Sequence, residues 1–126
     1  MEKYAQRICL TLDLKHQEDA IEAYKKYHEP GNVWTEIIQS LYDSGILDME
    51  IYLWANRLFM ILEVSEEFTL AKKAVMDEHN PKVQEWENLM QSNFQQALPG
   101  LEKVQWMPME CVFNLSTHRA ALDDMN

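Results

Sequence analysis

Three stretches of the chain alternate hydrophobic and polar residues at the two-residue period of a half-buried β-strand, and a fourth stretch is also predicted to be a strand. The first covers 7–13. Two more, 47–53 and 58–64, are joined by a short polar-containing link, which predicts a β-hairpin. The last covers about 104–115, where Pro108 favours a sheet edge or a bulge. The pattern therefore predicts four strands, of which the middle two are adjacent.

The segments between these strands repeat hydrophobic residues at the spacing of amphipathic helices. One helix is predicted over 18–28, before a Pro-Gly break, and a second from Trp34 to a glycine stop at Gly45. A third begins after Ser65, which is a suitable N-cap residue. Asn80 followed by proline begins the longest helix, which is predicted to run to the next Leu-Pro-Gly break.

This order of elements is the split βαβ arrangement of ferredoxin-like folds, βαββαβ. We expect one α+β domain over 1–115, with an antiparallel sheet covered by helices on one face, and a short frayed tail over 116–126. The other sheet face is expected to carry alternating leucine, isoleucine and methionine side chains. The simplest cover is a second copy, which predicts a homodimer of the dimeric α/β-barrel type.

Composition and charge narrow the classes of partner. A chain of 126 residues is enough for one domain with a core of its own. Its net charge of −10 argues against nucleic acid and anionic membranes, which bind clustered lysine and arginine, and is compatible with a neutral small molecule. No run is long enough for a membrane span, and two cysteines without a secretion signal indicate a reducing, cytoplasmic compartment.

The best candidate for a catalytic group is His28, at the end of the first predicted helix. It follows Tyr24 by four residues, so both rings lie on one helix face, one turn apart. A histidine at an open helix end, beside a phenol, can accept and donate protons near neutral pH. The alternative is structural: Tyr24 packs in the core and His28 favours the helix dipole.

Two tryptophans are candidates for a sugar site. Trp86 lies within the longest predicted helix and is followed by Glu87. An indole face can stack on the apolar face of a sugar while polar neighbours bond its hydroxyls. Trp34 begins the second helix, within reach of the end of the first, and either indole could instead anchor its helix to the sheet. The histidines lack the spacing of a zinc site and no glycine-rich phosphate loop occurs, so we expect no metal and no cofactor.

Five segments in register carry a resemblance to a known family. They are Tyr-Lys-Lys-Tyr-His-Glu-Pro-Gly-Asn-Val-Trp-Thr-Glu-Ile at 24–37, Asp-Met-Glu-Ile-Tyr-Leu at 48–53, Asn-Arg-Leu-Phe-Met-Ile at 56–61, Asn-Pro-Lys-Val-Gln-Glu-Trp at 80–86 and Met-Glu-Cys-Val-Phe-Asn-Leu at 109–115. Across these segments the chain resembles the L-rhamnose mutarotase family, and within it the branch associated with L-fucose.

The resemblance implies a homodimeric isomerase that interconverts the α and β anomers of a deoxy sugar by acid/base ring opening and closure. The family's Tyr-x-x-x-His pair, with the histidine as acid/base, maps onto Tyr24 and His28, and its helix tryptophan maps onto Trp86. Glu87 stands where rhamnose enzymes carry a second tryptophan. Together with a Gly-Asn insertion before Trp34, this difference favours L-fucose over L-rhamnose. Trp34 and Glu87 are further candidates for lining the sugar pocket.

Two rival functions fit the same dimeric fold. One is a cofactor-free or haem-degrading monooxygenase, in which His28 would face a large aromatic ligand. The other is a non-catalytic module that binds a sugar or a protein. The mutarotase is favoured because the matching segments include the site residues as well as the elements of the fold.

Overall fold

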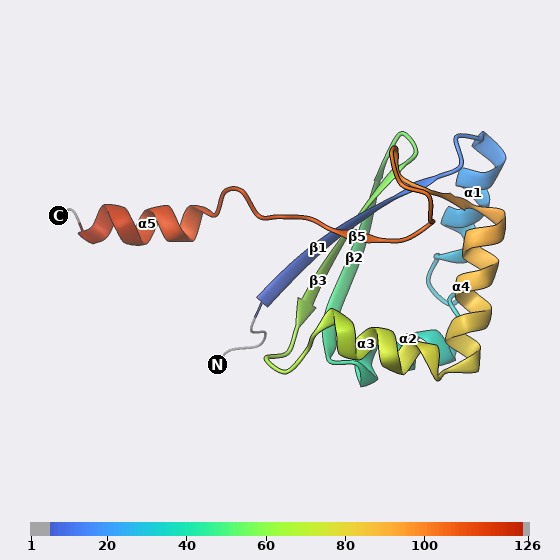
Figure 1. Cartoon of the computed structure of the whole chain (residues 1–126), viewed down its shortest axis with the longest axis horizontal. Coiled ribbons are helices and arrows are strands. Elements are labelled where there is room, and N and C mark those ends of the chain that lie inside the picture. The colour runs from blue at the N-terminus through green and yellow to red at the C-terminus, as the bar shows by residue number, and fades with distance from the viewer. Residues whose placement is uncertain (1–5, 125–126) are drawn as a thin grey trace.

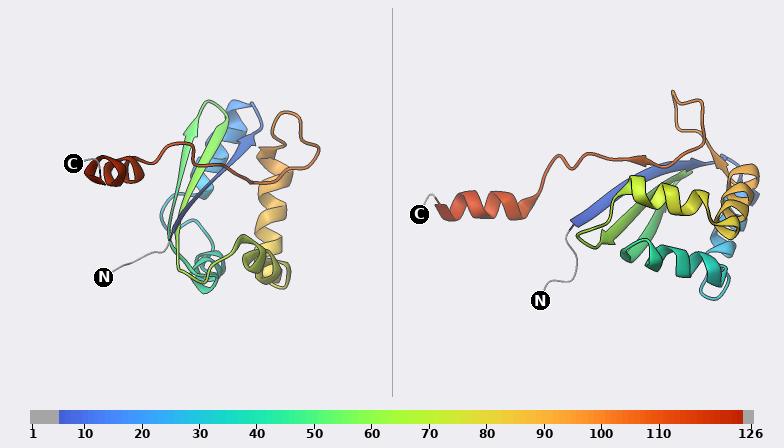
Figure 2. Two further views of the ribbon diagram at one scale, coloured as in Figure 1. Left: turned by 60° about the vertical axis from the view of Figure 1, so that its left-hand side comes forward. Right: turned by 60° about the horizontal axis from the view of Figure 1, so that its bottom comes forward.

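The computed structural model describes residues 6–124, in which strands and helices follow one another in the predicted βαββαβ order. The elements are β1 (Gln6–Leu14), α1 (Glu18–Tyr27), α2 (Thr35–Asp43), β2 (Ile46–Trp54), β3 (Arg57–Val64), α3 (Leu70–Glu78), α4 (Pro81–Asn93), β4 (Gln95–Gln96), β5 (Met107–Pro108) and α5 (Leu115–Asp124). The strands lie antiparallel in the order β2-β3-β1-β4, and β5 also pairs with β1. Helices α1 to α4 cover one face of this sheet (Figures 1 and 2), so the predicted α+β, ferredoxin-like fold is confirmed.

Alternation along β1, β2 and β3 sends one set of hydrophobic side chains toward the helices. Leu12, Leu58 and Val64 are at most 1% exposed, and the register of β1 against β3 places Leu12 opposite Leu58. The buried side chains form two clusters, one containing Trp86 of α4 and the other containing Phe68 of the loop before α3. Both clusters contribute to the wall of the cavity described below.

Helix signals in the sequence placed the two ends that matter most for the site. α1 ends at Tyr27 with His28 as its C-cap. α4 begins after Asn80, whose side-chain oxygen accepts hydrogen bonds from the backbone N–H groups of Lys82 and Val83. Proline occupies the first turn of α4, where its missing N–H costs nothing.

Two other helix ends differ from the prediction. The residue that caps α3 is Thr69, not Ser65, because 65–68 form a turn that turns Phe68 into the core. α4 ends at Asn93, short of the Leu-Pro-Gly break, because the chain leaves the helix to pair β4 with β1.

The last predicted strand, 104–115, is wrong over most of its length. Only Met107 and Pro108 pair with β1, and the backbone N–H of Met109 adds one more bond to the Cys9 carbonyl. Beyond this point 109–114 is exposed and leaves the sheet, and Leu115–Asp124 forms α5 where the sequence predicted a frayed tail. Figure 1 shows this segment and α5 extending away from the domain.

The uncovered sheet face differs in content from the prediction. The leucine, isoleucine and methionine side chains of the alternating runs point largely toward the helices. By alternation, the open face carries Cys9, Thr11, Tyr52, Phe59 and Ile61. It is therefore a mixed surface rather than a purely aliphatic one. Among residues 6–124, no helix combines the length and hydrophobicity needed to cross a bilayer.

Candidate active site

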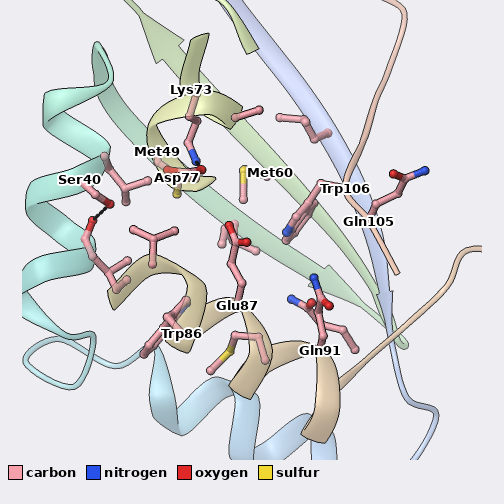
Figure 3. Close-up of a pocket in the computed structure, with 18 of the residues that line it drawn as sticks. Ser40, Met49, Met60, Lys73, Asp77, Trp86, Glu87, Gln91, Gln105 and Trp106 are labelled. Atoms are coloured by element: carbon pink, nitrogen blue, oxygen red, sulfur yellow. Dashed lines mark hydrogen bonds and ion pairs between the residues drawn. The ribbon is translucent and has the colours of Figure 1, made fainter. Parts of the chain in front are cut away.

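A cavity of about 710 Å³ lies between the helix layer and the sheet. This volume falls within the range of roughly 300–1,000 Å³ that is typical of small-molecule sites. The sheet contributes an apolar wall that includes Leu10, Met49, Ile51 and Met60, whereas the polar groups come mainly from helices. Figure 3 shows Trp86 and Glu87 of α4 on one side of this space and Trp106 on another.

Tyr24 and His28 lie together at the cavity, as their spacing predicted. Their rings stack with centroids 4.1 Å apart and an interplanar angle of 30°. Tyr24 is buried, at 4% exposure, whereas His28 at the helix end is half-buried. The last turn of α1 thus presents a phenol and an imidazole to the same space.

A backbone hydrogen bond determines which nitrogen of His28 is reactive. Nδ1 lies 2.7 Å from the carbonyl oxygen of Tyr24. A carbonyl oxygen can only accept, so Nδ1 carries the proton and Nε2 of the neutral ring is left with its lone pair. Burial lowers the pKa of His28 below the ordinary 6.5, and the Tyr24 carbonyl partly opposes that shift. At neutral pH the imidazole is therefore uncharged, with Nε2 available as a base.

Burial shifts the pKa of Tyr24 in the direction opposite to that of His28: it strongly raises the pKa of the phenol hydroxyl. A hydrogen bond from the Gln95 side chain partly offsets this rise. The phenol thus stays protonated and can donate a hydrogen bond. Gln95 is itself buried, at 7% exposure, and lines the cavity. Sequence reasoning missed it, because β4 is a two-residue strand that leaves no periodic signal.

Trp86 lies at the centre of an aromatic group and lines the cavity. Its ring meets those of His28, Tyr27 and Trp34 edge to face, at centroid distances of 5.6, 6.1 and 5.1 Å. Trp34 was expected to line the pocket, but it is absent from the cavity wall and packs against Trp86. The ammonium of Lys82 lies 5.6 Å from the Trp34 ring centroid. Trp34 therefore supports Trp86 instead of facing the cavity.

Glu87 points from α4 into the cavity, toward the side where α3 presents Lys73 and Asp77 (Figure 3). Burial raises the pKa of its carboxyl, the negative charge of Asp77 raises it further, and the charge of Lys73 opposes both. Lys73 and Asp77 form an ion pair one helical turn apart. Sequence reasoning missed this pair, because a lysine and an aspartate one turn apart are common on the exposed face of a helix.

No group of three histidine, cysteine, aspartate or glutamate side chains within 6–124 is arranged to hold a metal ion. The polar groups of the residues that line the cavity include an imidazole, a phenol, carboxylates, amides, one ammonium and the hydroxyl of Ser40. Together with an apolar wall and an indole, these groups suit a small polyhydroxylated molecule and proton transfer to or from it.

Comparison with known proteins gives a consistent result. The sequence profile of the L-rhamnose mutarotase family matches residues 7–115. An L-fucose mutarotase of Xanthomonas campestris pv. campestris is 39% identical over 112 residues, which cover 88% of this chain and 89% of the relative. A protein of Dictyostelium discoideum is 38% identical over 110 residues, covering 83% of this chain and 86% of the relative. The crystal structure of an L-rhamnose mutarotase from Formosa agariphila superposes with a TM-score of 0.64 at 25% identity, covering 87% of this chain and 98% of that one.

Proposed function

The chain belongs to the L-rhamnose mutarotase family, and we propose that it interconverts the α and β anomers of a 6-deoxy sugar, with L-fucose preferred and L-rhamnose second. It is an isomerase acting on sugar anomers. The finer assignment rests on one observation above all: Tyr24 and His28 stack at a cavity whose helical wall carries a carboxylate, Glu87. The preference for L-fucose is supported by the relative of that name and by the carboxylate where rhamnose enzymes carry an indole.

In the proposed mechanism, His28 is the acid/base. Nε2 takes the proton of the anomeric hydroxyl while the bond between C1 and the ring oxygen breaks, which leaves an open-chain aldehyde. The imidazolium then gives its proton to the former ring oxygen, now a hydroxyl. Rotation about the C1–C2 bond exposes the other carbonyl face, and the same steps in reverse close the ring. No atom is gained or lost between the two anomers, and His28 makes each proton transfer in the scheme.

Tyr24 and Trp86 would hold the sugar while this occurs. The phenol of Tyr24 stays protonated, which suits a hydrogen bond to the ring oxygen as negative charge develops there. Trp86 lines the cavity beside His28 and, with the apolar sheet wall, offers a surface for the C–H face of the sugar. Glu87 would accept hydrogen bonds from sugar hydroxyls. Trp34 would act only through Trp86.

We further propose that the active form is a homodimer. Val112 and Phe113 are 86% and 62% exposed on the segment that leaves the sheet, and Tyr52 on the open sheet face is 55% exposed. A two-fold pair in which each extended segment lies on its neighbour would cover both surfaces with one contact. The thiols of Cys9 and Cys111 are free, which supports the proposal of a reducing, cytoplasmic compartment.

The test is anomer exchange followed by saturation-transfer NMR, with L-fucose and L-rhamnose in parallel samples. We expect the protein to accelerate exchange of L-fucose more than that of L-rhamnose. Faster exchange of L-rhamnose would keep the reaction and refute the argument from Glu87. No acceleration of either sugar by folded protein would contradict the mutarotase itself. Neither a monooxygenase nor a non-catalytic module finds support among the relatives described above.

A further inference from the structure

Helix α3 turns Lys73 and Asp77 toward the cavity, beside its apolar residues Leu70 and Ala74. Lys73 and Asp77 line the cavity, with side chains 21% and 13% exposed, whereas Val75 and Met76 on the same helix are 55% and 43% exposed as residues. An amphipathic helix packed for stability alone would show the reverse arrangement. In this orientation Val75 and Met76 stay exposed to solvent, while the ammonium of Lys73 and the carboxylate of Asp77 face the cavity.

Partly burying the Lys73–Asp77 ion pair lowers the stability of the fold unless a bound ligand makes hydrogen bonds to the two charged groups. Taking an ion pair out of water carries a desolvation penalty that its mutual attraction often fails to repay. The surface pair Lys82–Glu85 has side chains 52% and 60% exposed and bears no such cost. Departures of this kind from optimal packing occur chiefly at functional sites.

Glu87 of α4 completes the group. Its carboxyl senses the charges of both Asp77 and Lys73, so the three side chains face the same part of the cavity (Figure 3). The two helices are held in register by Gln84, whose amide donates a hydrogen bond of 3.0 Å to the backbone carbonyl of Asp77. The group thus has a fixed geometry built from two helices.

We propose that Lys73, Asp77 and Glu87 form a recognition wall for the hydroxyl groups of the sugar and thereby set which deoxy sugar the enzyme accepts. The inference rests on the proposed mutarotase function and extends it to substrate selection. A carboxylate accepts hydrogen bonds from neighbouring hydroxyls, and an ammonium donates to hydroxyl oxygens, so the wall suits a neutral, polyhydroxylated ring. A site built to bond a particular hydroxyl rejects analogues that lack or invert it, because its own polar groups are then left unpaired.

The test compares variants in the wall with matched variants outside it. Lys73→Met, Asp77→Asn and Glu87→Gln alter the wall. Lys72→Met and Glu85→Gln make the same kinds of change on the exposed sides of the same two helices. Exchange rates measured over a range of sugar concentrations give kcat and KM for L-fucose and for a sugar with one hydroxyl inverted.

We expect each wall variant to raise the KM for L-fucose by about 10-fold or more, as loss of a charged hydrogen bond does. kcat should change by less than about 3-fold, because His28 is untouched, and the preference between the two sugars should shrink. The matched variants should behave as the unaltered protein does. A wall variant that folds and keeps both its KM and its sugar preference would refute the proposal.

The double variant Lys73→Met/Asp77→Leu separates recognition from a structural role. Replacing a half-buried ion pair by apolar side chains of similar size is often neutral or stabilising, so its Tm should hold or rise while sugar binding weakens. A fall in Tm with unchanged KM would mean that the pair is structural. If the unaltered protein accelerates neither sugar, the proposed function fails separately, and a tryptophan-fluorescence titration with L-fucose then decides the wall. Equal affinity of Glu87→Gln and Glu85→Gln for L-fucose, or no binding of L-fucose by the unaltered protein, would refute the proposed recognition wall.

Discussion

Replacing His28 by asparagine should abolish most of the activity while leaving the fold in place. The amide nitrogen of the new side chain can take over the bond that Nδ1 now makes to the Tyr24 carbonyl, at 2.7 Å. What is lost is Nε2, the proposed proton acceptor. General acid–base catalysis contributes roughly 10²–10⁴-fold. At about 1.4 kcal/mol per tenfold, the expected loss is about 3–5 kcal/mol of transition-state stabilisation.

The cost to the fold should be much smaller. The substitution removes the stacking of His28 on Tyr24, whose ring centroids are 4.1 Å apart. Such an aromatic pair contributes about 0.5–1.5 kcal/mol, which corresponds to a fall in Tm of a few degrees. Catalytic loss therefore exceeds stability loss by a wide margin, and the two can be measured separately by exchange NMR and thermal denaturation.

His79 offers a matched control. It is the C-cap of α3, and its Nδ1 lies 2.9 Å from the carbonyl oxygen of the residue four positions before it, as in His28. It is exposed and is absent from the cavity wall. His79→Asn should therefore change neither kcat nor KM. Retention of full activity by folded His28→Asn would refute the assignment of His28 as the base. Equal losses of activity in both variants would show that the loss comes from the altered helix cap and not from a missing base.

Four further predictions concern His28, Trp86 and the exposed segment that follows β5. Because burial lowers the pKa of His28 below 6.5 and the neutral ring is the active form, kcat/KM should be level above about pH 6.5 and fall only at lower pH; an acid limb above 6.5 would contradict this. In the same acid window the unfolded chain binds a proton that the folded chain does not, so stability should fall as pH drops below 6.5, and less so in His28→Asn. Trp86→Ala should lower stability by about 3–5 kcal/mol and should raise KM more than it alters the pH profile, as urea denaturation and pH profiles would show. Val112→Asp/Phe113→Asp should convert a particle of about twice 14.9 kDa to one of 14.9 kDa in light scattering, whereas an unaltered mass would exclude this segment from a dimer contact.

Local sequence signals accounted for most of the secondary structure. Asn80 before a proline began α4, the Glu-Pro-Gly stretch ended α1 with His28 as its C-cap, and two alternating runs formed the β2–β3 hairpin. These predictions succeed because caps, proline restrictions and strand alternation act within a few residues. The same locality places Tyr24 and His28 on one helix face, one turn apart.

What the sequence by itself determined, then, was the order of the elements, the Tyr24–His28 pair and the family to which the chain belongs. Tertiary structure decided the rest: that Gln95 meets Tyr24, that Trp34 supports Trp86 from outside the cavity, and that α3 turns Lys73 and Asp77 inward. Each of these depends on contacts between residues far apart in the chain, or on the rotation of a helix about its axis, which was not predicted from the sequence. The physical reason is that a helix adopts the rotation about its axis that gives the best contacts with all its neighbours together. At α3 those neighbours include a polar cavity, which no local sequence pattern encodes.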